Sequence, residues 1–352
     1  MSAVPVPLAD PSFAKRLVAW QSQHGRHDLP WQRNRDPYAI WLSEIMLQQT
    51  QVSAVTPYYL RFLDRFPSLA ALAASTEDDV LRLWSGLGYY SRARNLHQAA
   101  QSIATLHRGT FPRSREAIET LPGIGRSTAA AISVFAFGAR EAILDGNVKR
   151  VLARHFAVDG FPGERAVEKI LWTLAESLLP ATKIEAYTQG LMDLGATVCV
   201  RSKPQCGVCP LAGTCGARAQ DRIAELPVPK PRKPIPLRHT VMLILRDGDD
   251  TLLEKRAPIG IWGGLWSFPE VGNIEDVQRL CEARFGCAVL SKSALPVLRH
   301  GFTHFSLDIA PFLLRVRRSN TFAQERGSVW ISLDEARRAA LPVPVRKILA
   351  NL

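Results

Sequence analysis

The chain has 352 residues, of which 47% are hydrophobic and 22% are charged, a length and composition that predict two or three globular domains. It contains no apolar run near eighteen residues and no basic or Ser-rich leader, which argues against a membrane span and predicts no secretory or organellar address. The formal net charge of +12 makes nucleic acid the first partner to consider, although charge alone leaves that question open.

The first informative element is a helix predicted over residues 36–50. Asp36 followed by Pro37 is a strong helix start, with a side-chain cap and then a residue preset for the first helical position. Glu44 shares its helix face with apolar side chains three and four residues away. Desolvation there would raise its pKa and let it hold a proton near neutral pH, as a general acid must. Taken alone, the segment favours a simpler interpretation, an amphipathic helix with one glutamate at the edge of its buried face.

Residues 121–132 predict a helix, a tight turn and a second helix. Gly123 and Gly125 permit the turn, and the free N–H groups that open the second helix offer a site for a phosphate. A plain corner between two helices is the alternative. The basic charge of the chain and the neighbouring Arg126 favour a sequence-independent contact with the DNA backbone.

The next helix is predicted to begin near Asn147, which puts Asp145 at its N-terminus. By default such an aspartate is a cap. The same position would also lower its pKa and keep it ionised. One carboxyl with a raised pKa and a second held anionic is the arrangement that glycosidic-bond cleavage requires, because one protonates the leaving group and the other supports the oxocarbenium-like sugar.

A cysteine cluster follows, formed by Cys199, Cys206, Cys209 and Cys215 with the spacing C-x6-C-x2-C-x5-C. Four thiols this close suit a metal or iron–sulfur site, and the spacing alone leaves zinc and an iron–sulfur cluster about equally plausible. A disulfide framework is not expected in a long chain without a secretory signal. Cys281 and Cys287 lie elsewhere and are expected to be ordinary semi-buried thiols.

A proline-rich stretch then divides the chain. Residues 13 to about 216 have helical periodicity, whereas residues 226–238 hold five prolines in thirteen positions and predict a domain boundary. The remainder is predicted to be a small α+β unit. Its expected strands are Thr240–Arg246, Thr251–Arg256, Phe302–Val316 and Val329–Ile331, and its expected helices are 274–285 and 333–350. The predicted organisation is a helical region 1–216, a basic linker 217–238 and a second domain 239–352.

Together these motifs resemble the helix-hairpin-helix DNA glycosylases that carry a [4Fe–4S] cluster, and among them the MutY-type adenine DNA glycosylases. The resemblance rests on residues 29–31, 41–52, 86–90, 121–125 and 144–148 and on the four clustered cysteines. It implies a multidomain fold in which a mostly α-helical glycosylase domain precedes a small α+β Nudix-like domain. The six-helix module would span about 31–142, the terminal helices and the iron–sulfur loop would occupy 1–30 and 143–216, and the Nudix-like domain would recognise 8-oxoguanine.

The resemblance also implies the reaction, a monofunctional base removal in base excision repair. The substrate would be adenine mispaired with 8-oxoguanine or guanine in double-stranded DNA, flipped out of the stack. Glu44 would protonate the adenine at N7, Asp145 would stabilise the cationic sugar or a covalent sugar adduct, and Asn147 would orient the site. The four cysteines would hold one [4Fe–4S] cluster. A monomeric protein in the bacterial cytoplasm, acting on DNA, is expected.

The same resemblance assigns the DNA contacts. The residues expected to line the adenine pocket are Trp31, Leu47 and Gln189. Those expected to probe the opposite base are Gln49, Thr50, Leu87 and Tyr89, with Tyr89 as an intercalating wedge. Those expected to read 8-oxoguanine are Phe302, Thr303 and His304. The hairpin residues Gly123, Gly125 and Ser127 would lie along the DNA backbone.

Ser127 decides the subtype of the predicted reaction. Bifunctional relatives of the endonuclease III type carry a lysine here that forms a Schiff base with the sugar, which serine cannot do. The alternatives are a bifunctional endonuclease III-like glycosylase/lyase and a non-catalytic, lesion-binding redox protein. Nucleotide hydrolysis by the second domain is not expected, because the stretch 279–286 holds only one acidic residue where a Nudix hydrolase needs a glutamate-rich metal helix.

Overall fold

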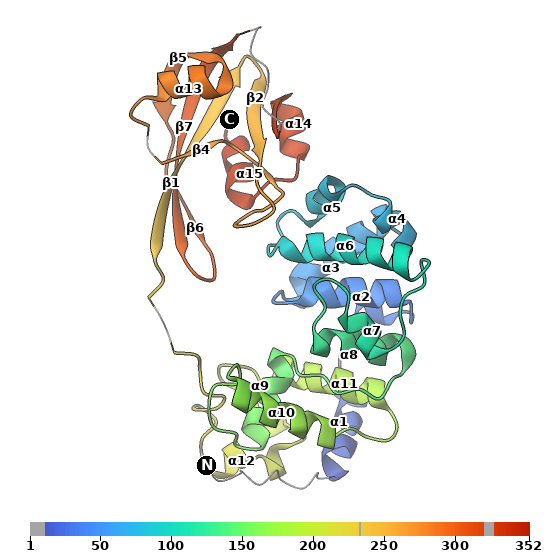
Figure 1. The fold of residues 1–352 in the computed structure, drawn as a ribbon. Helices are drawn as coiled ribbons and strands as arrows, with labels where there is room; N and C mark the ends of the chain where they lie inside the picture. Colours follow the sequence, from blue (N-terminus) through green and yellow to red (C-terminus); the bar gives the residue numbers. More distant parts are fainter. Residues whose placement is uncertain (1–10, 232–233, 273, 320–326) are drawn as a thin grey trace. The chain divides into compact units, whose positions relative to one another are not determined.

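The structure is a computed structural model that describes residues 11–231, 234–272, 274–319 and 327–352 (Figure 1). Residues 1–10 of the predicted helical region and residues 232–233 of the predicted linker therefore lie outside the described residues. The chain divides into two compact units, Met1–Ala73 with Gln98–Arg232 and Ala74–His97 with Lys233–Leu352. None of the helices in the described ranges has the length and apolar composition that a membrane span requires.

The first unit is helical, as predicted. Its helices are α1 (Pro11–His24), α2 (Pro37–Leu47), α3 (Val52–Arg65), α4 (Leu69–Ala73), α7 (Arg115–Glu119), α8 (Arg126–Phe137), α9 (Gly146–His155), α10 (Arg165–Ser177), α11 (Ile184–Asp193) and α12 (Gly216–Ala219). A short 3-10 turn, η1 (Pro30–Gln32), precedes α2, and a π-helical turn, η2 (Leu194–Val198), continues α11. Two more 3-10 turns, η3 (Cys206–Val208) and η4 (Ala212–Thr214), lie in the cysteine loop. Helix α6 (Ser91–Leu106) runs from the second unit into the first.

Helix α2 is buried on almost every side. Trp41 and Leu42 are inaccessible to solvent, and the Tyr38 hydroxyl donates to the backbone oxygen of Phe66 at 2.8 Å. A helix that is apolar all round belongs in a protein interior. Glu44 is therefore not the edge residue of an amphipathic surface helix, which was the simpler interpretation of this segment. A second core joins α1, α9, α10 and α11 around residues such as Phe13 and Leu152.

The predicted starts of two helices are confirmed, namely the helix that carries Glu44 and the helix that begins at Asp145. Asp36 caps α2 by accepting a hydrogen bond from the N–H of Tyr38 at 3.1 Å. Asp145 caps α9 by accepting one from the N–H of Val148 at 2.8 Å. Each cap fixes the direction in which its helix leaves the preceding loop. The predicted hairpin is present as well, as α7, a turn and α8, and its Gly123 has φ +79°, a left-handed conformation that favours glycine.

The second unit contains a mixed sheet and short helices. Its strands are β1 (Leu237–Asp247), β2 (Asp250–Lys255), β3 (Trp266–Ser267), β4 (Glu270–Val271), β5 (Cys287–Ala294), β6 (Leu298–Gly301), β7 (Ser306–Arg318) and β8 (Ser328–Ser332). In the described residues the sheet has eight strands with the central order β3-β2-β1-β7-β5, and β1 and β7 run parallel, with Leu243 opposite Phe312. The helices are α5 (Glu77–Trp84), α13 (Val277–Phe285), α14 (Leu333–Arg338) and α15 (Val343–Leu349).

Two predicted elements of this unit are wrong in detail. The strand predicted over 302–316 begins only at Ser306, because the N–H of Phe302 bonds the oxygen of Phe305 at 2.8 Å and closes a turn between β6 and β7. The helix predicted over 333–350 is two helices, α14 and α15. Pro342 lies between them, and a proline disfavours helical geometry in the residue that precedes it.

The division into units also differs from the predicted boundaries at 216 and 238. Helix α12 lies within the predicted linker, and β1 begins before its end. Segment 74–97 groups with the C-terminal residues, and polar contacts join the two. The Ser85 hydroxyl donates to the oxygen of Leu341 at 2.6 Å and contacts the Arg346 guanidinium. Contacts of this kind join residues far apart in the sequence and cannot be read from its periodicity.

Candidate active site

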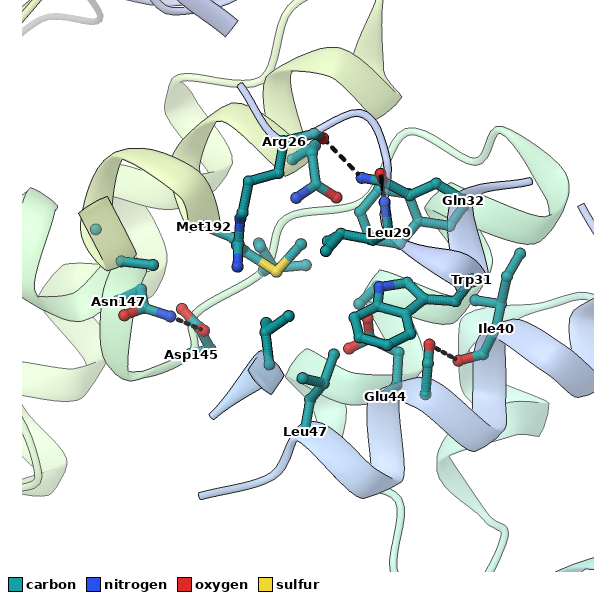
Figure 2. A pocket seen from close by; sticks show the side chains of 18 of the residues that line it. Arg26, Leu29, Trp31, Gln32, Ile40, Glu44, Leu47, Asp145, Asn147 and Met192 are labelled. Carbon is teal, nitrogen blue, oxygen red and sulfur yellow. Dashed lines mark hydrogen bonds between the residues drawn. The ribbon is translucent and has the colours of Figure 1, made fainter. Parts of the chain in front are cut away.

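A pocket of about 1590 Å³ opens in the first unit, and both predicted catalytic carboxylates line it (Figure 2). The predicted site residues that line it are Trp31, Glu44, Leu47, Gln49, Thr50, Ser127, Asp145, Asn147 and Gln189. Figure 2 shows Asp145 and Asn147 on one side of the pocket and Glu44, with Trp31 and Leu47, on the other. The volume exceeds that of a typical small-ligand site, so the pocket has room for a nucleoside.

Glu44 projects from buried helix α2 into this pocket. Burial raises the pKa of its carboxyl to about 8, and the nearby charge of Asp145 adds to the shift. Among the described residues, no neighbouring donor forms a hydrogen bond with the Glu44 carboxyl. No hydrogen bond therefore favours its charged form. The carboxyl therefore holds its proton at neutral pH, in the direction that the sequence predicted.

Asp145 has different surroundings. Its Oδ1 accepts from the N–H of Val148 at 2.8 Å, and its Oδ2 accepts from Asn147 Nδ2 at 3.1 Å. These donors lower its pKa, as expected at a helix N-terminus, but burial raises it by more, so the net shift is upward and not downward as predicted from the sequence. Asp145 thus has donors that favour its charged form, whereas Glu44 has none among the described residues.

Asn147 is itself held in one orientation. Arg150 Nη2 donates to Asn147 Oδ1 at 2.8 Å, which leaves the amide nitrogen to donate to Asp145. Arg150 also donates to the oxygens of Gly195 and Cys199, at 2.5 and 2.7 Å. Turn η2 approaches α9 so closely that a Cβ on Gly195 would lie 2.6 Å from the Cβ of Asn147. One helix thus presents Asp145 and Asn147 to the pocket and contacts the cysteine loop.

Ser127 lines the pocket but is engaged in the fold. Its Oγ accepts a hydrogen bond from the N–H of Leu144 at 2.9 Å and so holds the backbone next to Asp145. The neighbouring Arg126 contacts Glu176 and lies 3.9 Å from the centre of the Trp172 ring, so it has partners within the chain besides the DNA backbone expected from the sequence. The hairpin glycines are exposed and do not line the pocket.

The clustered cysteines share a second, much smaller pocket in the first unit. It is lined by Cys199, Cys206, Cys209 and Cys215. Burial raises the pKa of the Cys209 thiol to about 11, and each of the other three thiols adds to the shift, so the four sulfurs lie near one another. The described residues hold no ready-made group of three or more metal-ligating side chains. The shared pocket and the four-thiol donor set nevertheless fit an iron–sulfur cluster or a zinc ion.

The loop around these cysteines is braced by a buried arginine. Arg154, which is 3% exposed, donates to the oxygens of Val200 and Leu226, both at 2.7 Å, and to Cys199 Sγ at 3.4 Å. A buried guanidinium needs such acceptors to offset its desolvation. Arg154 was not singled out in the sequence, where it resembles any polar residue of a helix.

The remaining predicted DNA contacts lie in the second unit. Thr303 and His304 are exposed on the turn between β6 and β7, and the Tyr89 and Thr303 hydroxyls are 3.3 Å apart. Phe302 packs with Trp262 and His300, with ring centres 5.4 and 4.7 Å away. Leu87 is buried, whereas Tyr89 is 46% exposed with φ +49°. An exposed aromatic ring on a tight turn is suited to stacking on a base.

Other pocket features were missed in the sequence. Arg26 lines the pocket and is ion-paired with Asp193, with Nε 2.7 Å from Oδ1. The two residues are far apart in sequence, so no local pattern connects them. The only signal for Asp193 in the sequence is its position one helical turn after Gln189, where its carboxylate can reach the Gln189 side chain.

Comparison with known families matches two separate stretches of the chain. Residues 42–177 match the HhH-GPD superfamily of base excision DNA repair proteins, and residues 240–351 match the NUDIX domain. The chain is similar to an adenine DNA glycosylase of Buchnera aphidicola subsp. Baizongia pistaciae, with 37% identity over 97% of this chain and 96% of the relative. It is also similar to the adenine DNA glycosylase of Homo sapiens, with 32% identity over 96% of this chain and 73% of the relative.

Solved structures agree with the helical part of the fold. A thermostable thymine-DNA glycosylase is 31% identical and superimposes with a TM-score of 0.55 over 59% of this chain and 96% of its own. A non-covalent endonuclease III–DNA complex has a TM-score of 0.51 over 60% of this chain and 95% of its own, and at 20% identity it supports the fold alone.

Proposed function

Because the chain belongs to the adenine DNA glycosylase family, we propose that it hydrolyses the N-glycosidic bond of adenine mispaired with 8-oxoguanine or guanine in duplex DNA. The observation that carries the proposal is the asymmetric pair of carboxyls at one pocket. Glu44, with a pKa of about 8, has no donor among the described residues, while Asp145 accepts hydrogen bonds from Val148 and Asn147. A base enclosed in duplex DNA must leave the stack to reach such a pocket.

In the proposed reaction Glu44 acts first. Its proton passes to N7 of the flipped adenine, which makes the base a neutral leaving group when the bond to the sugar breaks. The apolar side chains of Trp31 and Leu47 line the same pocket and would keep bulk water from competing for that proton.

Asp145 supports the other half of the bond. As the C–N bond lengthens, positive charge develops on the sugar, and an anionic carboxylate stabilises that charge directly or as a covalent adduct that water then hydrolyses. Asn147 positions the carboxylate through its bond to Oδ2. Because this carboxylate is already oriented by its donors, little reorganisation accompanies the reaction.

The proposed reaction ends with base removal. Ser127 offers no amine for a Schiff base, and its hydroxyl already accepts the N–H of Leu144. The product is then an intact strand with an abasic site, and the alternative glycosylase/lyase activity is not expected.

Recognition of the opposite base is proposed for the second unit. The loop Phe302-Thr303-His304 would read 8-oxoguanine, and Tyr89 would occupy the space left in the stack. Leu87 would probe the same base. Gln49 and Thr50 belong to the first unit, and the contact with the opposite base that the sequence predicts for them remains a proposal. The contact between the Tyr89 and Thr303 hydroxyls supports a shared role for these two residues.

The four cysteines are proposed to hold one [4Fe–4S] cluster. Such a cluster is bound by four thiolates and would brace the loop between Cys199 and Cys215. Base removal transfers no electrons, so the role proposed for the cysteine loop is structural, with Arg201 and Lys203 near a DNA phosphate. The monomeric state and the bacterial cytoplasm expected from the sequence remain part of the same proposal.

A duplex series tests the function. We expect the protein to act on adenine opposite 8-oxoguanine and opposite guanine but not opposite cytosine or thymine. Strand scission should appear only after alkali, because the abasic product is not cleaved by the protein. Single-turnover incubation of labelled duplexes, with and without alkali, followed by denaturing gel electrophoresis measures both expectations.

Two outcomes of that series contradict the proposal. Equal cleavage opposite all four bases removes the mispair specificity. Scission without alkali, or borohydride trapping as strong as that of a lysine-bearing endonuclease III-type enzyme, removes the monofunctional assignment.

The cluster has its own test. We expect purified protein to carry about four iron and four sulfide ions per chain and to absorb broadly in the visible range. Replacement of Cys206 by alanine should lower the iron content, because it removes one of four ligands. The matched variant Cys281→Ala, a buried thiol of the second unit, should retain iron. One zinc ion per chain and no sulfide would contradict the assignment.

A further inference from the structure

A buried carboxylate behind the pocket connects two of its polar residues. Asp193, at the end of α11, is 1% exposed and is not itself a lining residue. It accepts three hydrogen bonds: from the backbone N–H of Arg26 at 2.9 Å, from Arg26 Nε at 2.7 Å and from Gln189 Nε2 at 2.8 Å. Both partners line the pocket. Asp193 therefore acts on a molecule in the pocket through Arg26 and Gln189, to which it is hydrogen-bonded.

The contact with Asp193 fixes the orientation of the Gln189 amide. An ion-paired carboxylate only accepts hydrogen bonds, so the amide nitrogen must face it. The carbonyl oxygen, which lies in the same plane, is then the amide atom that is turned away from Asp193. Among the described residues Gln189 makes no hydrogen bond through Oε1. This oxygen is left as an acceptor for a ligand in the pocket.

The same carboxylate anchors the loop that carries Trp31. Gln32 Nε2 donates to the oxygen of Arg26 at 3.0 Å, and Gln32 Oε1 accepts the N–H of Leu29 at 3.1 Å. Figure 2 shows Arg26, Gln32 and Leu29 together along one side of the pocket. The side chain of Arg26 contains only donors, and its Nε binds the same Asp193 oxygen, Oδ1, as the Gln189 amide nitrogen.

We propose that Asp193 is a positioning residue that determines which purine the pocket accepts, by orienting Gln189 as an acceptor and Arg26 as a donor. This inference rests on the proposed function. The matching ligand has an exocyclic amine beside a ring-nitrogen acceptor, as on the Watson–Crick edge of adenine. Hypoxanthine presents the opposite pattern, a carbonyl beside an N–H, and would leave buried groups unpaired. Hypoxanthine also has an N7 lone pair, so both bases can accept the proton of Glu44.

The test compares rates on two bases in four proteins. Single-turnover excision of adenine and of hypoxanthine, each opposite 8-oxoguanine, is measured for the wild type, Asp193→Asn, Gln189→Leu and the double variant. We expect Asp193→Asn to lower the ratio of the adenine rate to the hypoxanthine rate about tenfold, because the amide of Gln189 is no longer held in one orientation. In the Gln189→Leu background the same change should not lower the ratio further.

A matched variant separates orientation from packing. The hydroxyl of Thr197 donates to the backbone oxygen of Asp193 at 2.8 Å and not to its side chain. Thr197 also lines the pocket, so Thr197→Val alters packing at the site while the hydrogen bonds of the Asp193 carboxylate stay in place, and it should change both rates in the same proportion. If Asp193→Asn does not fold, as judged by circular dichroism and duplex binding, Gln189→Leu alone must still lower the ratio.

The inference is overturned if Asp193→Asn slows both bases equally or lowers the ratio as much without Gln189 as with it. An unchanged ratio in Gln189→Leu also overturns it. Each of these results leaves wild-type adenine excision intact and so leaves the proposed function standing. A wild type that excises no adenine opposite either 8-oxoguanine or guanine overturns the proposed function instead.

Discussion

Replacing Glu44 by glutamine should abolish adenine excision and leave duplex binding in place. Glutamine has the same shape but cannot donate the proton that the departing base needs, and loss of a general acid costs about 10²–10⁴-fold in rate. The affinity for DNA depends mainly on phosphate contacts, which this change does not touch. Single-turnover excision and titration of a labelled A:8-oxoguanine duplex measure the two expectations separately.

The pH profile of the wild type should depend on the same proton. With a pKa of about 8, Glu44 is protonated below that pH and loses its proton above it. The excision rate should therefore fall as pH rises through about 8. Glu168, a half-exposed glutamate of α10 paired with Lys149, gives a matched control, because Glu168→Gln should keep both the rate and the profile.

Glu44→Gln should also stabilise the fold, increasingly so as pH rises. The pKa of Glu44 is higher in the folded chain than its ordinary value of 4.5, so its contribution to stability is present at acidic pH and is lost as pH rises toward 8. Glutamine has no such dependence. We expect the variant to gain about 3 kcal/mol over the wild type at pH 7 and under about 1 kcal/mol at pH 5, by urea unfolding. A variant that excises adenine normally, or one that is less stable at every pH, contradicts the assignment of Glu44.

The start of each catalytic helix could be read from the sequence because the signal is local. Asp36-Pro37 and Asp145-Gly146-Asn147 are caps, and a cap depends on backbone groups two or three residues away. The four cysteines were found for the same reason, since their spacing is short. The strands predicted over 240–246 and 251–256 correspond to β1 and β2 for a similar reason, because a hairpin is also a local signal. Each of these predictions uses forces that act within about one helical turn or one hairpin.

The rest of the site depends on contacts between distant segments. Arg26 and Asp193 meet although 167 residues separate them, and nothing near either residue indicates the other. The upward shift of the Asp145 pKa reflects how deeply α9 is packed, which periodicity does not reveal. The sequence likewise gave no reason to group segment 74–97 with the C-terminal residues, because the bonds of Ser85 to Leu341 and Arg346 exist only in the folded chain.

Replacing Asp145 by asparagine should slow excision by about 10²–10³-fold while the fold persists. Asparagine caps a helix as well as aspartate does, so the bond to the N–H of Val148 can remain. The negative charge is lost, however, and with it the stabilisation of the cationic sugar. Asn147 then faces a second amide, because Arg150 keeps its oxygen turned away from Asp145. Single-turnover excision and thermal unfolding give the two measurements.

Asp36→Asn is the matched control for the cap. Asp36 begins α2 as Asp145 begins α9, but it does not line the pocket, so the control should keep its excision rate within a few-fold.

The residual activity of Asp145→Asn should also have a different pH dependence from the wild type. The charge of Asp145 helps to raise the pKa of Glu44, so removing it should move the alkaline limb of the pH profile to lower pH. If the limb stays where it is in the wild type, the two carboxyls do not act on each other, and the proposed division of roles between a protonated and an anionic carboxyl is wrong.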